Sequence, residues 1–169
     1  MTTLADVNAM NAAAFVASFG DVAEHSPWVA EKALGFAPFE TRDAVVASFE
    51  QAMREAPKDD QLALIRAHPD LAGKAAISGE IAEDSKREQA GAGLDTLTAD
   101  EFARFTDLNT RYRNKFGFPF IFAVKGATKH MILDAFEKRL ENDSDAEFET
   151  ALTQIARIFR FRLEDRISG

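Results

Sequence analysis

The sequence predicts an all-α protein, a helical bundle of about seven to eight helices with one short extended aromatic segment. Apolar residues recur at steps of three and four over most of its 169 residues, which is the period of a helix with one buried face. Serine or threonine precedes several of these runs and glycine or proline follows them, as at helix ends. No repeat, low-complexity tract or linker divides the chain, so we expect a single domain over residues 1–169.

Four helices are expected in the first half of the chain, over residues 4–19, 26–35, 41–57 and 59–68. Gly20 is expected to end the first, and Ser26 followed by proline predicts the start of the second. Thr41 is the expected N-cap of the third. The fourth should end at His68, because Pro69 disfavours helical backbone in the residue before it.

Four more helices are expected in the second half, near residues 78–94, 98–116, 128–140 and 144–167. The first of these is polar and is interrupted by two glycines. Thr98 with Glu101, and Ser144 with Glu147, each have the spacing of a capping box. The segment FGFPFIFAV, residues 116–124, is short and contains a proline, which predicts an extended buried stretch.

Composition excludes several classes of function. The net charge of −8 argues against a protein that tracks nucleic-acid phosphates. No apolar run approaches the roughly 20 residues of a membrane span, so no membrane association is expected. The absence of cysteine excludes disulfides and thiolate chemistry and makes a cytoplasmic location the expectation. The motif HExxH is absent and only three histidines are present, so no metal site is expected.

His68 is the first candidate for chemistry. Imidazole titrates near pH 6.5, so it donates or accepts a proton at neutral pH. A helix end stopped by a rigid proline would hold the ring in a defined direction. The alternative is a structural histidine that interacts only with the helix dipole. His25 and His130 are expected to be structural.

A second candidate is the helix segment EDSKREQAG, residues 83–91. Ser85, Glu88 and Gln89 are three and four positions apart, so their side chains share one helix face, whereas Lys86 and Arg87 point elsewhere. A hydroxyl, a carboxylate and an amide on one face can orient a small polar molecule or an imidazole. The alternative is an ordinary solvated charged helix.

Two further features complete the set of candidates. Buried backbone groups of the FGFPFIFAV segment need hydrogen-bond partners, and a ligand rich in ureide groups would supply them. The alternative is an aromatic plug of the core. In the last helix, Arg162 and Arg166 fall on or beside the apolar stripe, whereas Arg160 lies well off it. A buried arginine must pair with a carboxylate of the protein or of a substrate, unless it only reaches the rim.

Taken together, these features resemble the family of 2-oxo-4-hydroxy-4-carboxy-5-ureidoimidazoline (OHCU) decarboxylases, which complete urate breakdown to (S)-allantoin. The resemblance rests on HPDLAGK at residues 68–74, SKREQ at 85–89 with AGL at 92–94, NKFGFPFIFAVKG at 114–126 and the arginine-bearing last helix. It covers essentially the whole chain in order. It implies an all-α enzyme that needs no cofactor, acts on a small-molecule ureidoimidazoline and forms a homodimer.

The resemblance also implies roles for individual residues. His68 and Glu88 would be catalytic, with His68 as acid/base and Glu88 orienting it. The implied substrate-binding residues are Pro69, Ser85, Lys86, Arg87, Gln89, Phe120, Ile121, Phe122, Ala123, Val124 and Arg162.

Two other functions are weighed against this one. The first is a non-catalytic all-α module that binds a ureide or a partner helix. The second is a metal-dependent hydrolase that uses His68, Asp70 and nearby carboxylates.

Overall fold

The computed structural model describes residues 1–169 and is all-α, as predicted. Its α-helices are α1 Leu4–Ala9, α2 Ala12–Phe19, α3 Trp28–Ala33, α4 Arg42–Arg54, α5 Lys58–Ala67, α6 Lys74–Ser78, α7 Glu83–Gly91, α8 Ala99–Phe116, α9 Lys129–Arg139 and α10 Ser144–Arg166, with a 3-10 helix at Leu34–Phe36. The helices α1, α3 and α6 have five or six residues, and the other seven have eight or more. None of the helices is long and apolar enough to cross a membrane.

Several of the predicted helix boundaries are wrong. The polar helix expected near residues 78–94 spans only Glu83–Gly91, and the short helix α6 before it was not predicted. The single helix expected over residues 4–19 is two helices, because Met10 is extended and the Asn11 side chain caps α2 by accepting from the Ala14 N–H. Ser26 does not cap α3, since its hydroxyl donates to the Glu24 carbonyl oxygen. The capping box expected at Ser144 is replaced by Asp143, which accepts from the Ala146 N–H, while Glu147 is buried in a different network.

The chain divides into two compact units. The first unit comprises residues 1–67 and 156–169, and the second comprises residues 68–155. Helix α10 begins in the second unit and its last residues belong to the first. The expectation of a single domain over residues 1–169 therefore stays a prediction.

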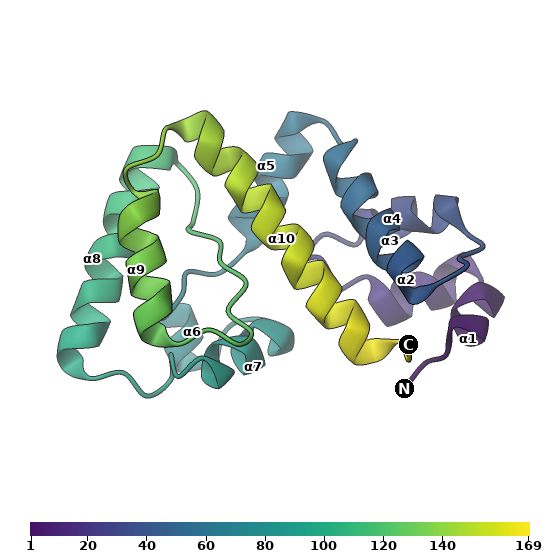
Figure 1. Cartoon of the computed structure of the whole chain (residues 1–169), viewed down its shortest axis with the longest axis horizontal. Coiled ribbons are helices and arrows are strands. Elements are labelled where there is room, and N and C mark those ends of the chain that lie inside the picture. The colour runs from purple at the N-terminus through teal and green to yellow at the C-terminus, as the bar shows by residue number, and fades with distance from the viewer. The chain divides into compact units, whose positions relative to one another are not determined.

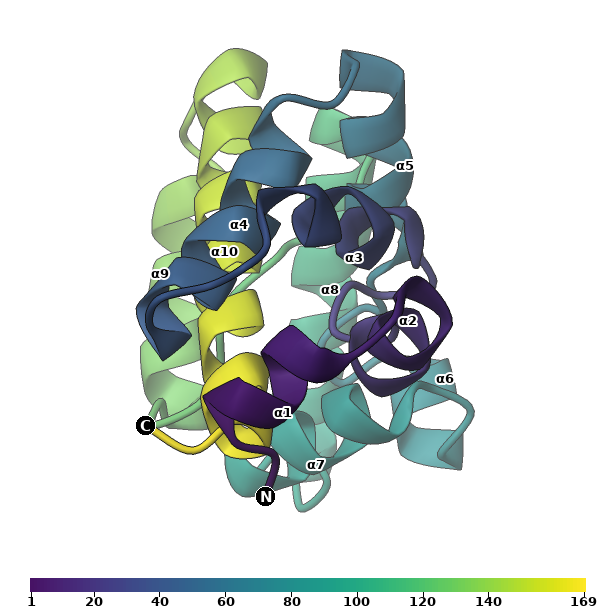
Figure 2. The same cartoon turned by 90° about the vertical axis from the view of Figure 1, so that its right-hand side faces the viewer.

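The first unit has a core of packed phenylalanine rings. Phe15 contacts the rings of Phe19, Phe39 and Phe49, and Phe49 in turn meets Phe159 of α10 edge-on. The two chain termini lie close together in this unit (Figure 2), where Thr2 forms a parallel bridge with Ile167. These contacts bury the inner face of α10 that carries Arg162.

The second unit is built around Tyr112 of α8. Its fully buried ring contacts the rings of Phe116, Phe118, Phe120 and Phe136. Helices α8 and α9 lie side by side, and the extended segment that joins them belongs to the same, second unit (Figure 1). As predicted, residues 117–124 form no helix. The aromatic segment is therefore both part of this core and a stretch of backbone with few regular hydrogen bonds.

Helix α8 begins with the capping box predicted from the sequence. The Glu101 N–H donates to the Thr98 hydroxyl, and the Thr98 N–H donates to the Glu101 carboxylate. This backbone hydrogen bond, aided by Lys129, lowers the pKa of Glu101 from 4.5 to about 2. The stability that the ionised carboxylate contributes is complete above pH 4.5 and is lost as the pH falls through 2.

We therefore expect Glu101→Gln to destabilise the protein at pH 7 and to have progressively less effect as the pH falls from 4.5 towards 2. Urea unfolding of both proteins at pH 7, 4 and 3 measures the difference. Glu149→Gln, which changes an exposed carboxylate in the second turn of α10, is the control. A Glu101→Gln effect that is independent of pH would contradict this reading of the cap.

Candidate functional site

His68 directly follows the last residue of α5 and is the first residue of the second unit. It is only 6% exposed, although it lies at the junction between a helix and a loop. Pro69 follows it, so the prediction that the helix stops at this point is confirmed. His25 and His130 are both exposed, in agreement with the structural roles expected for them.

The loop after His68 is held by the Gln89 side chain of α7. The Ala72 N–H donates to Gln89 Oε1 at 2.9 Å, and Gln89 Nε2 donates to the Asp70 carbonyl oxygen at 3.3 Å. Ala72 has a positive φ of 54°, a conformation that costs a non-glycine residue free energy and persists only where other contacts impose it. The Gln89 amide therefore fixes the backbone two to four residues after His68.

Helix α8 holds the same loop from another direction. Asn109 Nδ2 donates to the Leu71 carbonyl oxygen at 2.9 Å, and Arg113 Nε lies 2.9 Å from Asp70 Oδ1. Asn109 is buried, whereas the Arg113–Asp70 ion pair is partly exposed. Three side chains from two helices thus define the path of the chain just after the histidine.

The polar face predicted for helix α7 lies on the inner side of the helix. Ser85 and Gln89 are buried and Glu88 is half-buried, so these three share the inner side of the helix as expected. Lys86 and Arg87 are exposed, and Arg87 pairs with Asp84. The structure therefore joins Gln89 to the His68 loop, buries Ser85 on the same side of α7, and leaves the Arg87 side chain 74% exposed.

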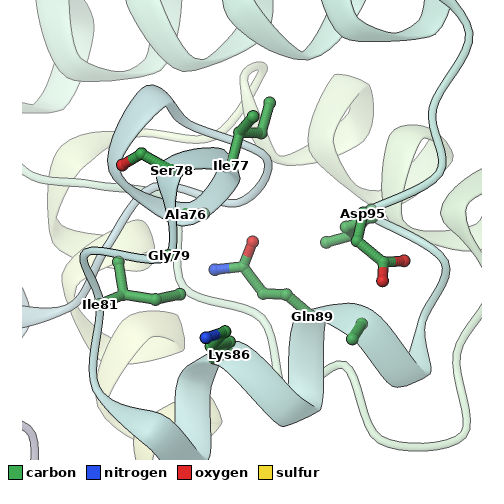
Figure 3. A pocket seen from close by; sticks show the side chains of 10 residues that line it. Ala76, Ile77, Ser78, Gly79, Ile81, Lys86, Gln89 and Asp95 are labelled. Carbon is green, nitrogen blue, oxygen red and sulfur yellow. The ribbon is translucent and has the colours of Figure 1, made fainter.

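A cavity of about 310 Å³ lies between α6, α7 and the residues that follow each helix. Figure 3 shows Gln89 projecting from α7 towards α6, with the Lys86 amine on the same helix beside Ile81 and Gly79. Neither His68, Ser85 nor Glu88 lines this cavity. It therefore borders two of the predicted substrate-binding residues and is separate from the histidine.

The extended aromatic segment has an uneven set of backbone partners. The Ala123 N–H donates to Gln154 Oε1 at 2.9 Å, and the Ile121 carbonyl oxygen accepts from Arg139 Nη1. The N–H groups of Ile121 and Phe122 make no hydrogen bond within the chain. Ile121 is buried and Phe122 is half-buried. Of the backbone donors predicted to hold a ligand, Ala123 is thus already used by the protein.

The arginines of α10 have distinct environments in the first unit. Arg162 is 5% exposed, and it donates to Glu24 Oε1 at 2.8 Å and to the Val22 carbonyl oxygen at 3.0 Å. Arg160 pairs with exposed Asp43, and Arg166 pairs with Asp21. Of the two arginines predicted on or beside the apolar stripe, Arg162 is buried and has a protein carboxylate among its partners, whereas the Arg166 side chain is 23% exposed.

Sequence reasoning missed Asn109, Arg113, Arg139 and Glu147. A signal for the last two was present, since Arg139 falls three residues after Phe136 and Glu147 four residues before Ala151, each in register with an apolar stripe. A charged residue in such a register predicts a buried ion pair. Asn109 also falls in register with an apolar stripe, four residues after Phe105 and three before Tyr112, but its loop partner lies 38 residues away in sequence. No local pattern marks Arg113, whose partner lies 43 residues away.

No group of three or more His, Cys, Asp or Glu side chains in residues 1–169 is arranged to hold a metal ion. The residues that hold the His68 loop are instead amides and one arginine–carboxylate pair.

Together, the fold and this loop define an all-α protein in which a buried histidine leads into a loop held by side chains of two helices. Residues 8–164 match the OHCU decarboxylase family. An OHCU decarboxylase of Haloferax volcanii is 40% identical over 99% of this chain and 97% of its own length. The mouse OHCU decarboxylase is 33% identical over 96% of this chain and 92% of its own length.

A solved structure resembles this chain in fold as well as in sequence. The crystal structure of an (S)-allantoin synthase superposes with a TM-score of 0.79 at 33% identity, and it covers 98% of this chain. This chain spans only 54% of that longer protein. The chain therefore belongs to the OHCU decarboxylase family. It is by membership a decarboxylase, that is, a carboxy-lyase, of urate degradation.

The two hydrogen bonds that the Gln89 side chain makes to the loop after His68 predict the effect of a Gln89 substitution on stability. Gln89→Leu leaves the buried Ala72 N–H without its acceptor, so we expect the free energy of unfolding to fall by about 1–3 kcal/mol. Urea unfolding measures this loss. Gln51→Leu, which removes an exposed side chain that bonds Glu55 within α4, is the matched control and should change stability by less than about 0.5 kcal/mol. Equal losses of unfolding free energy in the two variants would show that the hydrogen bonds of Gln89 to the loop stabilise the protein no more than a surface contact does.

Proposed function

We propose that this chain decarboxylates 2-oxo-4-hydroxy-4-carboxy-5-ureidoimidazoline to (S)-allantoin, with His68 as the acid/base. The observation that carries the proposal is the family match over residues 8–164, a range within which all of the candidate site residues lie. The burial of His68 and the loop that Gln89 holds behind it support this role, because a proton donor must be held in one direction to act on one face of a carbon.

The reaction needs no electron acceptor outside the substrate. The bond from the hydroxyl-bearing ring carbon to the carboxylate breaks and CO₂ leaves. The released electron pair forms a C=C bond to the neighbouring ring carbon, and the π pair of that carbon's C=N bond moves onto the nitrogen, which takes up a proton. A proton is then added to one face of this neighbouring carbon, which becomes the stereocentre, while the hydroxyl loses its proton and becomes the carbonyl of allantoin. The protein has to bind the ring in one orientation, stabilise developing charge and deliver that proton.

The chain's own residues divide these tasks. In this proposal Glu88 orients His68 and the substrate hydroxyl, and His68 handles the proton. Arg162 binds the carboxylate, while free N–H groups of residues 120–124 bind the ureido group. Ala123 is an exception, since its N–H is already bonded to Gln154. Ser85 and Gln89, both buried on α7, contribute a hydroxyl and an amide on the side of the His68 loop.

We further propose that residues 1–169 act as one domain, that the active protein is a homodimer, and that it works in the cytoplasm without a cofactor. The unbroken family match supports the first of these. Size-exclusion chromatography with light scattering tests the second, because a mass near 18.6 kDa would contradict it and twice that mass would support it.

The activity is tested by generating the substrate in situ from urate and following its disappearance with and without the protein. The proposal requires decay faster than the spontaneous rate and proportional to protein concentration. The alternative, a ureide-binding module, predicts saturable allantoin binding with an unchanged decay rate. A metal-dependent hydrolase predicts that a chelator abolishes the acceleration, a result that would overturn the proposed mechanism.

A further inference from the structure

A buried charge network lies directly beneath the aromatic segment in the second unit. Glu147 Oε1 accepts from the Tyr112 hydroxyl at 2.6 Å and from Arg139 Nε at 2.8 Å. Glu147 Oε2 accepts from Asn142 Nδ2 at 3.0 Å. Glu147 has no exposed surface and Arg139 is 9% exposed, so the pair is shielded from solvent. Three donors thus fix one carboxylate, and that carboxylate fixes the guanidinium.

Arg139 carries this arrangement to the segment. Its Nη1 donates to the Ile121 carbonyl oxygen, and its guanidinium carbon lies 4.3 Å from the centre of the Phe120 ring. The Phe120 ring is itself stacked on Phe136, with the ring centres 3.8 Å apart. Both the backbone and a side chain of the segment are therefore held by one buried cation.

The hydrogen bond from Arg139 to the Ile121 carbonyl oxygen also fixes the direction of the Phe122 N–H. Ile121 C=O and Phe122 N–H belong to the same peptide unit, which is trans, so the two groups point in opposite directions. The Phe122 N–H accordingly points away from Arg139, and it makes no hydrogen bond within the chain. A cation bonded to the carbonyl oxygen polarises the amide and strengthens its N–H as a donor, more so in a buried site.

We infer that Arg139 is a positioning residue that orients and polarises the Ile121–Phe122 peptide so that the Phe122 N–H binds a carboxylate or ureido oxygen of the substrate. The inference rests on the proposed function for the identity of the ligand. Glu147, held by Tyr112 and Asn142, fixes Arg139 and balances its charge. Burial and the hydrogen bond to Glu147 raise the pKa of Tyr112 well above its usual range, so the hydroxyl remains a donor at every pH at which the protein is assayed.

The bond from Arg139 Nη1 gives the buried Ile121 carbonyl oxygen its partner, and it also joins the network to the peptide that carries the Phe122 N–H. Glu147 could be paired by Arg139 Nε, Tyr112 and Asn142 without the Nη1 contact to Ile121. The bond to that carbonyl is therefore the feature that links the network to a ligand. It also makes the inference testable apart from stability.

The test removes the charge without leaving a buried ion unpaired. Arg139→Met with Glu147→Gln keeps the net charge and the volume of the site, and Arg139→Gln with Glu147→Gln is a second, polar version of the same change. Arg104→Met with Glu137→Gln is the matched control, because that pair joins α8 to α9 on the exposed surface and does not touch the segment. Each protein is characterised by urea unfolding, by the ¹⁵N chemical shift of Phe122 and by steady-state kinetics.

We expect the ¹⁵N resonance of Phe122 to move in both network variants and to be unchanged in the control, since an amide ¹⁵N shift responds to hydrogen bonding at the preceding carbonyl. We expect KM for the substrate to rise about fivefold with a smaller change in kcat, because the bound oxygen is already polar before the reaction. A folded network variant with the KM and the Phe122 resonance of the unaltered protein would overturn the inference.

The NMR measurement does not depend on the proposed reaction. If the unaltered protein fails to accelerate substrate decay, the proposed function fails, while the Phe122 resonance still decides whether Arg139 polarises the peptide. If the unaltered protein is active and only KM in the network variants is unchanged, the proposed function stands and the role of Arg139 in binding is overturned.

Discussion

Replacing His68 by asparagine should reduce decarboxylation by about 100- to 10,000-fold, the usual contribution of a positioned acid/base. Asparagine keeps a polar side chain of similar reach, but it cannot take up and release a proton near neutral pH. Because Gln89, Asn109 and Arg113 hold the loop after His68, we expect the substitution to leave the fold intact. The measurement is the initial rate of substrate loss above the spontaneous rate.

His130→Asn is the matched control, since His130 is exposed near the start of α9. It should retain full activity. A His68→Asn protein with an unchanged far-ultraviolet circular dichroism spectrum and full activity would remove His68 from the mechanism. In that case the burial of His68 would have to be explained by packing alone.

Replacing Glu147 by leucine should lower the free energy of unfolding by about 3–5 kcal/mol, the typical effect of removing one partner of a buried ion pair. The Arg139 guanidinium would be left buried without its counter-charge, and Tyr112 and Asn142 would lose their acceptor. Urea unfolding followed by tyrosine and tryptophan fluorescence measures the loss.

Glu137→Leu provides the comparison, because Glu137 and its partner Arg104 are about half exposed. Its loss should be less than about 1 kcal/mol. The double change of Arg139 and Glu147 should also cost less than Glu147→Leu alone, since it leaves no buried charge uncompensated. If Glu147→Leu and Glu137→Leu had equal effects, the buried network would not be the stabilising feature described above.

The helices of this protein could be predicted from local pattern because their signals are local. Thr41 and Thr98 cap α4 and α8 where the sequence predicts, and Pro69 follows the end of α5. The errors arose where two local signals compete. The helical spacing of residues 4–19 includes the polar Asn11 among its apolar positions. The Asn11 side chain accepts from the Ala14 N–H at a second helix start, and this capping contact determines the break.

The start of α10 shows a prediction that failed because of a contact with another helix. Serine followed three residues later by glutamate has the spacing of a capping box, yet Glu147 lies on the buried face of α10 and pairs with Arg139 of the preceding helix. A buried counter-charge stabilises the carboxylate more than a surface cap would. The local pattern could not reveal this, because the competing partner lies on another helix.

The residues of the candidate site also fall into two groups, those with a local sequence signal and those whose partners are distant in sequence. The candidate catalytic and binding residues, His68 and the Ser85 to Gln89 group, are proposed from their motifs and their helical spacing, and their roles stay predictions. The contacts that hold the His68 loop could not be predicted, since Asn109 and Arg113 act across 38 and 43 positions of sequence. Helix α8 connects the two parts of the second unit, with Asn109 on the His68 loop and Tyr112 on the network under the aromatic segment.

The central claim is that this chain delivers a proton to one face of its substrate, and the circular dichroism of the product tests it most directly. With substrate generated from urate, we expect a rapid signal of (S)-allantoin in the presence of the protein, and a slow approach to an optically silent racemate with His68→Asn or with no protein. A trace with the unaltered protein that superimposes on the spontaneous reaction would contradict the account.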